Sequence, residues 1–144
     1  MPEQVKLIPV LKIGVSNGND RIYTKDAAKE IVSQYRKTLN DNKPMFGELH
    51  YPSYVDGESF GAVDLSKASH TIDDVYIKED IVFADATFLN NMNGKTALSM
   101  LEHGFAVMRP RCVGSINDDH EVEIKQVIAF DIIGAKDDSF KGLI

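Results

Sequence analysis

Residues 68–88 of this chain, ASHTIDDVYIKEDIVFADATF, decide its fold class. Residues 68–78 and 80–88 alternate between apolar and polar side chains with a period of two, which is typical of strands that bury one face. Residues 78–80 (KED) lie where the two segments meet and provide a polar turn. The pattern predicts a β-hairpin, and therefore an antiparallel sheet, in the middle of the sequence.

The segments on either side predict two helices. Apolar residues at helical spacing after Thr24 indicate an amphipathic helix that ends near residues 40–42, with the Thr24 side chain as its N-cap. The residues of its apolar face are Ala27, Ala28, Ile31, Val32, Tyr35 and Leu39. A short second helix is predicted over residues 95–103, where Gly104 occupies the C′ position that favours glycine.

Three further strands complete the predicted domain. Residues 5–15 form the first, and Pro9 within it indicates an edge position or a bulge, because proline has no amide hydrogen to donate. Residues 105–116 and 120–134 form the last two. Residues 1–144 are therefore predicted to be one α+β domain, with a mostly antiparallel, β-barrel-like core and two or three helices.

Charge and composition exclude several classes of function. The 144 residues carry a formal net charge of −6, which repels phosphates and argues against a nucleic-acid partner. No segment reaches the roughly 20 apolar residues that span a bilayer, and the N-terminus does not have the pattern of a signal peptide. Cys112 is the only cysteine, so no internal disulfide is expected and a reducing cytoplasm is the expected compartment. The four histidines show no ligand spacing, so neither a metal nor another cofactor is expected.

Five short motifs follow one another in an order found in a known family. They are NGNDRIY at residues 17–23, GELHYP at 47–52, ASHTI at 68–72, MRPRCVGS at 108–115 and FDII at 130–133. With these motifs the chain resembles the prohead proteases of tailed phages, whose fold is related to that of the herpesvirus assemblins. The resemblance spans about residues 8–137 and implies the same fold.

The resemblance also locates the catalytic positions, and the residues there differ from those of the family. The family's serine nucleophile is the first serine of Val-Ser-Ser-Arg, where this chain has Arg109. Its general base is the histidine of Asp/Asn-His-Pro, where this chain has Tyr51. Arginine stays protonated and cannot attack a carbonyl, and tyrosine, with a pKa near 10, is a poor base at neutral pH. No catalytic residue is therefore expected at the family's positions.

A site rearranged around other residues is one alternative. His50 lies one residue before the expected base, and Cys112 or Ser115 could replace the nucleophile. Asp131 would be the carboxylate of such a site. A shift of one or three residues along a strand points a side chain to the opposite face, which argues against His50 and Cys112 as substitutes.

Two arginines, with Tyr51 as a further contact, indicate a binding site at the former catalytic position. Arg109 and Arg111 flank a proline, and their planar guanidinium groups suit the carboxylates of a partner; the alternative is a solvated strand with two surface ion pairs. They could also lower the pKa of the neighbouring Cys112 thiol. His70 matches the family's Ser-His-x-Ile motif and could pair with Asp131. The name vestigial site is used below for Tyr51, His70, Arg109 and Arg111.

These observations predict a catalytically inactive relative of the prohead proteases that acts structurally in capsid assembly or head stabilisation. The expected partners are the major capsid protein, scaffold proteins and further copies of the chain, in the host cytoplasm during assembly and then in the virion head. Two alternatives stay open. One is an active maturation endopeptidase with a rearranged site, and the other is a module that binds a small molecule or peptide in the vestigial site.

Overall fold

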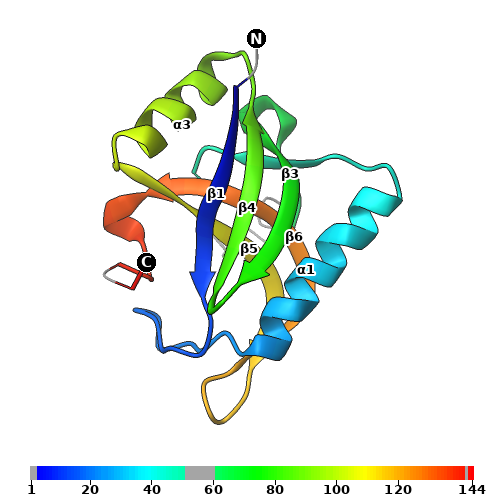
Figure 1. Cartoon of the computed structure of the whole chain (residues 1–144), viewed down its shortest axis with the longest axis vertical. Helices are drawn as coiled ribbons and strands as arrows, with labels where there is room; N and C mark the ends of the chain where they lie inside the picture. The colour runs from blue at the N-terminus through cyan, green and yellow to red at the C-terminus, as the bar shows by residue number, and fades with distance from the viewer. Residues whose placement is uncertain (1–2, 51–60, 142) are drawn as a thin grey trace.

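A computed structural model describes residues 3–50, 61–141 and 143–144 of the chain (Figure 1). The elements, in chain order, are β1 (Glu3–Lys12), α1 (Lys25–Asn40), β2 (Met45–Glu48), the 3-10 helix η1 (Leu65–Lys67), β3 (Ala68–Lys78), β4 (Ile81–Phe88), α3 (Met92–Glu102), β5 (Ala106–Ile116), β6 (Val122–Gly134) and the 3-10 helix η2 (Ala135–Asp137). The predicted α+β class with antiparallel sheets is confirmed. No helix among the described residues is long and apolar enough to cross a membrane.

The predicted central hairpin consists of β3 and β4. The strands pair antiparallel from His70 opposite Phe88 to Lys78 opposite Ile81, and residues 79–80 form the turn. Every second residue of β4 is buried, as the period of two predicts. The buried residues of this strand are Val82, Ala84, Ala86 and Phe88.

Strands on both sides extend the hairpin into a four-stranded antiparallel sheet with the order β1-β4-β3-β2. β1 lies at one edge, and its register shifts between Pro9 and Leu11, so the predicted edge position and the predicted bulge occur together. A second shift surrounds Leu7, which has a φ of 58° and donates its N–H to Asp85. Irregular edges of this kind resist pairing with other chains.

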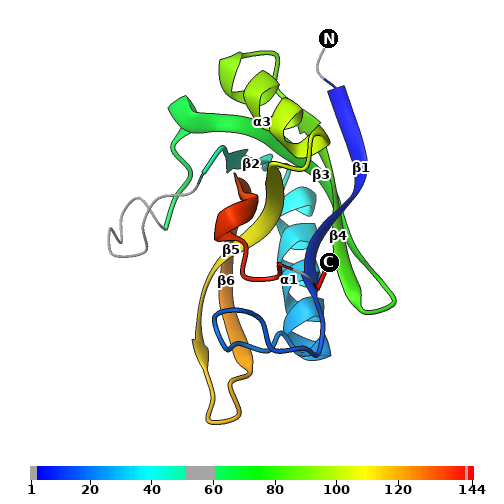
Figure 2. The same ribbon diagram turned by 90° about the vertical axis from the view of Figure 1, so that its left-hand side faces the viewer.

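β5 and β6 form a separate two-stranded sheet, and Figure 2 shows them running beside α1 to a turn that projects from the body. The predicted barrel-like closure is wrong, because the two sheets do not join into a closed ladder. Within the described residues, the backbone link between β6 and the β2 end of the larger sheet is one parallel bridge from Leu49 to Ile132. The space between the sheets is filled by side chains of the core, including Val10, Met108 and Phe130.

Helix α1 packs its apolar face against both sheets. The Thr24 side chain caps it as predicted, accepting from the N–H of Ala27. The Tyr35 hydroxyl donates to the Ile72 carbonyl in β3, and the Gln34 side chain bonds the backbone of β6 at residues 125 and 127. Leu39, which was predicted on the apolar face, lies in the last turn of the helix and is 50% exposed.

Helix α3 begins three residues earlier than the sequence predicts. Asn91 is its N-cap, and the Asn91 side chain accepts from the N–H of Gly94. Gly104 follows the helix with a φ of 76°, so the predicted C′ glycine is confirmed. α3 covers one end of the sheet, next to the N-terminus of β1 (Figure 1).

Candidate functional site

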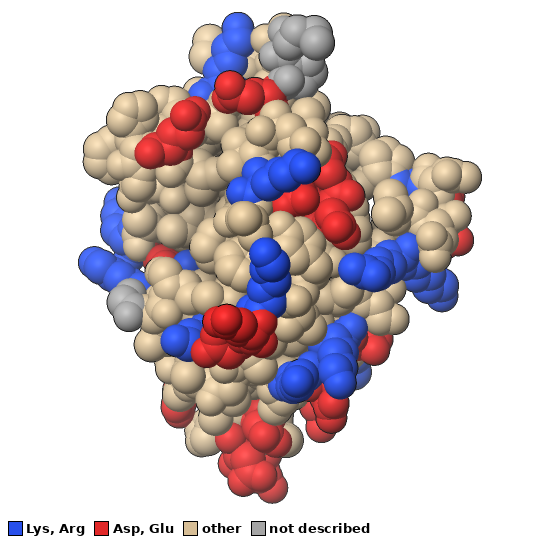
Figure 3. Space-filling view, viewed as in Figure 1, with Lys and Arg blue, Asp and Glu red and all other residues tan. Residues whose placement is uncertain are grey.

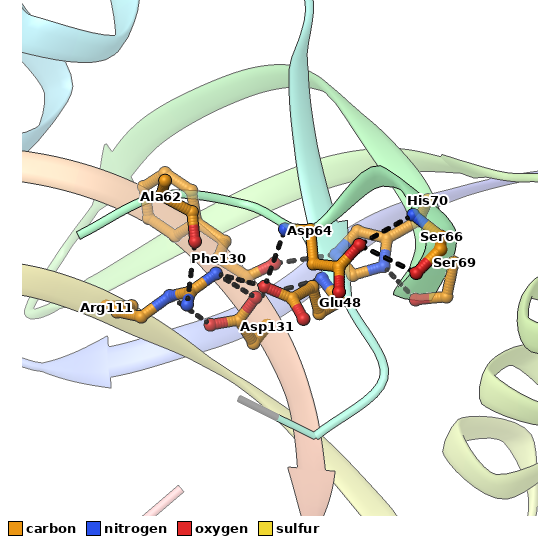
Figure 4. A network of polar contacts seen from close by, with 9 residues as sticks. All are labelled: Glu48, Ala62, Asp64, Ser66, Ser69, His70, Arg111, Phe130 and Asp131. Carbon is orange, nitrogen blue, oxygen red and sulfur yellow. Dashed lines mark hydrogen bonds and ion pairs between the residues drawn. The ribbon is translucent and has the colours of Figure 1, made fainter. Parts of the chain in front are cut away.

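One arginine and two carboxylates meet where β2, β5 and β6 come together (Figure 4). Arg111 Nη2 lies 2.9 Å from Glu48 Oε2, and Arg111 Nε lies 3.0 Å from Asp131 Oδ2. The N–H of Glu48 donates to Asp131 Oδ1 over 2.9 Å. At most 1% of each side chain is exposed. These three residues, named the Arg111 network below, come from three motifs that are far apart in the sequence.

In the Arg111 network, one guanidinium group pairs with two carboxyl groups, and all three side chains are buried. Burial raises the pKa of Asp131 to about 6, although the Arg111 guanidinium and the N–H of Glu48 both lower it. The segment before β3 closes the network from outside. The Asp64 N–H donates to Glu48 over 3.3 Å, and Arg111 donates to the Ala62 carbonyl over 3.4 Å.

His70 lies beside the Arg111 network and is fully buried. Its Nε2 is 2.6 Å from the Phe130 carbonyl oxygen, so Nε2 carries the proton. Its Nδ1 therefore accepts from the Ser69 hydroxyl, 2.7 Å away. Burial lowers the pKa of His70 to about 4, partly offset by the bond to Phe130. The predicted pair of His70 with Asp131 does not form. The two ring nitrogens of His70 bind the Phe130 carbonyl and the Ser69 hydroxyl instead.

Arg109 is fixed by contacts within the chain. Its Nε and Nη2 donate to the two carboxylate oxygens of Asp138 over 2.7 and 2.8 Å. Its Nη1 donates to the carbonyls of Pro9 and Val10 in β1, and the guanidinium lies 5.4 Å from the centre of the Phe140 ring. Arg109 thus connects the edge of the four-stranded sheet to the two-stranded sheet and to the C-terminal segment.

A comparison with solved structures finds a similar fold in a phage protein. The structure of the bacteriophage T4 capsid assembly protease, gp21, matches this chain with a TM-score of 0.68 and 20% sequence identity, over 92% of this chain and 90% of that chain. The chain has a prohead-protease-like fold. A scan against protein-family models and a search of curated protein sequences find no match.

Within this prohead-protease-like fold, the surface interpretation of Arg109 and Arg111 is wrong. The two residues are 5% and 2% exposed, so neither forms a surface ion pair. The carboxylates that they bind are the chain's own Asp138, Glu48 and Asp131. The sequence predicts the affinity of the guanidinium groups for carboxylates, but it does not show that residues of the same chain supply them.

Cys112 packs against the core and is half-buried. Burial, together with the smaller effect of the nearby Asp131 carboxylate, raises the pKa of its thiol to about 12. The predicted lowering by the two arginines is wrong, because both guanidinium groups are paired with carboxylates. A thiol with this pKa is not a nucleophile at neutral pH.

The substitute residues of a rearranged site lie far apart. The exposed His50 donates its N–H to the Ile132 carbonyl, whereas Ser115 pairs with Glu123 near the other end of β6. At about 3.3 Å per residue, the nine positions between these points amount to about 30 Å along the strand. Cys112 is opposite Val127, about 16 Å along the strand from Ile132.

Tyr51, the fourth residue of the vestigial site, lies outside the described residues. Among the residues that are described, no group of three His, Cys, Asp or Glu side chains could hold a metal ion. Sequence reasoning missed Glu48, Ser69 and Asp138 as partners of the site residues. Glu48 and Ser69 lie inside the matched motifs, and this position could have identified them as candidate site residues. Asp138 has no such signal, because it lies outside all five motifs.

The two perturbed groups of the site should act on stability in opposite directions between pH 4 and pH 6.5. The unfolded chain binds a proton at His70 near pH 6.5 and the folded chain only near pH 4, so stability falls by about 3 kcal/mol as the pH drops through this window. The folded chain protonates Asp131 near pH 6 and the unfolded chain near pH 3.9, so stability rises by about 3 kcal/mol as the pH drops. The two effects should nearly cancel.

Single variants separate these two effects. His70→Gln keeps an amide donor for the Phe130 carbonyl and removes the titration, so its stability relative to the parent should increase as the pH falls from 6.5 to 4.5. Asp131→Asn should show the reverse trend. Urea unfolding of the three proteins at several pH values gives the differences. Equal pH slopes for His70→Gln and the parent protein would show that His70 does not titrate as described.

Proposed function

We propose that this chain is a catalytically inactive relative of the phage capsid assembly proteases and that it acts structurally in head assembly. The observation that carries the proposal is Arg109. The motif resemblance aligns this residue with the family's nucleophile. Five atoms of the chain hold its guanidinium group in the core: two oxygens of Asp138 and the carbonyl oxygens of Pro9, Val10 and Met108. A residue in this position cannot attack a peptide carbonyl.

The motif residues that this chain shares with the family support the proposal, because they hold the fold together. Glu48, Arg111 and Asp131 form the Arg111 network, and His70 joins β3 to the backbone of β6. The two catalytic positions, in contrast, carry Arg109 and Tyr51. A protein with a purely structural function is expected to lose its catalytic residues and to retain the residues that stabilise its fold.

The geometry is unfavourable to both alternative functions. A rearranged protease needs a nucleophile within about 3 Å of a base, and His50 is separated along β6 from both Cys112 and Ser115. A binding module at the vestigial site needs guanidinium groups that a ligand can reach, and both arginines are buried and paired. For the proposed structural role, the partners are the major capsid protein or scaffold proteins of the same phage, and the location is the virion head.

A cleavage assay tests the proposal. The purified chain is mixed with the capsid and scaffold precursors of its own phage, and intact masses are followed over hours. A lysate of infected cells serves as the positive control, because it shows where the precursors are normally cut. We expect no shortened product with the purified chain, and co-elution of the chain with capsid or scaffold subunits on size exclusion.

Three variants, His50→Ala, Cys112→Ala and Ser115→Ala, are assayed in parallel. Specific cleavage by the parent protein that one of these variants abolishes would overturn the proposal and identify the rearranged site. Absence of both cleavage and co-elution would reject the structural role in the capsid.

A further inference from the structure

A groove on the outer side of α1 carries a concentration of positive charge that is unusual for this acidic protein. The groove has a volume of about 510 Å³ and lies between α1 and the end of β3. Its lining residues are Lys29, Val32, Ser33, Arg36, Lys37, Asn40 and Ile77. The helical residues are spaced so that they share one face of α1, and the groove contains three cations and no carboxylate.

The three cations of this groove have no internal partner among the described residues. The ion pairs there involve Lys12, Arg109, Arg111 and His120, and none involves Lys29, Arg36 or Lys37. All three cations are exposed, whereas the half-buried Val32 and Ile77 provide apolar contact area. The groove therefore suits a ligand that combines carboxylates with aliphatic side chains.

The turn between β5 and β6 has the complementary properties. Residues 116–123 read INDDHEVE, with four acidic residues in eight. Asp118 and Asp119 are exposed, as are the aliphatic side chains of Ile116 (44%) and Val113 (40%). Figure 3 shows acidic side chains at the lower tip of the molecule, where this turn projects, and basic side chains on the side of α1.

The turn is held in a fixed shape by its own chain. Asn117 accepts from the N–H groups of Asp119 and Glu121, and Ile22 exchanges backbone hydrogen bonds with His120 and Val122. A preformed hairpin loses little conformational entropy when it docks. Ile22 holds the turn in place through these hydrogen bonds. The turn therefore cannot fold back to reach the groove of its own chain.

We propose that the β5–β6 turn of one copy of this chain docks into the α1 groove of a second copy. Asp118 and Asp119 would pair with Lys29 and Arg36, and Ile116 would contact Val32 and Ile77. The contact joins two different surfaces, so it is heterologous and can continue from copy to copy. The inference rests on these two surfaces and is independent of the proposed function.

Sedimentation velocity of the full chain over a range of concentrations tests the contact. We expect reversible association beyond the dimer, weaker at higher salt because exposed charges are screened. The groove variant Lys29→Glu/Arg36→Glu and the turn variant Asp118→Asn/Asp119→Asn should each raise the dissociation constant at least 10-fold; the turn variant is neutral at these positions, so its turn does not pair with the groove variant. Lys67→Glu/Lys95→Glu is the matched control, since it makes the same charge change at exposed positions away from the groove, and it should associate like the parent.

A mixture of the two variants gives the decisive result. The groove variant keeps an intact turn and the turn variant keeps an intact groove, so the mixture should form a 1:1 heterodimer and nothing larger. A parent protein that stays monomeric at every concentration, or a mixture that stays monomeric, overturns the inference. A groove variant or a turn variant that associates as strongly as the parent also overturns the inference. Loss of capsid or scaffold co-elution in the groove variant, without a change in self-association, would assign the groove to a different partner.

Discussion

Replacing Arg111 with methionine is expected to destabilise the protein by about 3–5 kcal/mol at neutral pH, because the change leaves Glu48 and Asp131 buried without their cation. Small domains have total stabilities of about 5–15 kcal/mol, so this loss removes a large part of the unfolding free energy. Urea unfolding followed by circular dichroism measures it. Arg21→Met is the matched control, since Arg21 is exposed and lies outside the Arg111 network and the α1 groove, and its effect should stay within about 0.5 kcal/mol.

The cause of this loss can be separated from a simple packing defect. If the uncompensated carboxylates are responsible, Arg111→Met should regain stability as the pH falls through the raised pKa of Asp131, because protonation of Asp131 removes a buried negative charge. The triple variant Arg111→Met/Glu48→Gln/Asp131→Asn should also be more stable than the single variant at pH 7. A loss below 1 kcal/mol, or a loss that is independent of pH, would contradict the role assigned to the Arg111 network.

Replacing Gly47 with alanine is the second change with a large expected effect. A Cβ atom at this position would overlap Nε2 of His70 and the carbonyl oxygen of Phe130, the two atoms that form the buried hydrogen bond between β3 and β6. Forcing a methyl group into a packed core costs about 1–3 kcal/mol, and separating a buried donor from its acceptor costs about 1–3 kcal/mol more. We expect a destabilisation of about 3 kcal/mol or more by urea unfolding.

Two further variants show whether the overlap is the reason. Gly134→Ala adds the same methyl group where the nearest atom, Asp137 Oδ2, is 3.4 Å away, so it should be nearly neutral. His70→Ala removes one of the two overlapping groups, so Gly47→Ala should cost less in a His70→Ala background than in the parent. Additive effects of the two substitutions would mean that Gly47 and His70 do not contact each other as described.

These predictions concern residues that hold the prohead-protease-like fold together. The Arg111 network and the His70 contacts join β2, β3, β5 and β6 whether or not a nucleophile is present. Arg109 adds a contact of its own, because its guanidinium group binds β1 and Asp138. Replacing Arg109 with serine would leave Asp138 without this partner, so the residue at position 109 also affects the packing.

The sequence by itself determined the local structure. The period of two over residues 68–88 predicts the β3–β4 hairpin, and Thr24 with the following apolar residues predicts α1. These features follow from short-range preferences, because alternation, capping and turn chemistry act between residues close in the chain. The motif order also predicted the fold, since matches at intervals along the chain reflect a shared arrangement of elements.

Only the tertiary structure decided the environment of the charged residues. Arg111, Glu48 and Asp131 are separated by 20 or more residues, and nothing in their neighbouring sequence shows that they meet away from water. Whether a guanidinium group is a surface charge, a binding site or a core contact depends on which distant carboxylates lie beside it. The pKa of Cys112 depends on burial in the same way. These properties arise from desolvation and long-range contacts, which only the packing of β2, β5 and β6 creates.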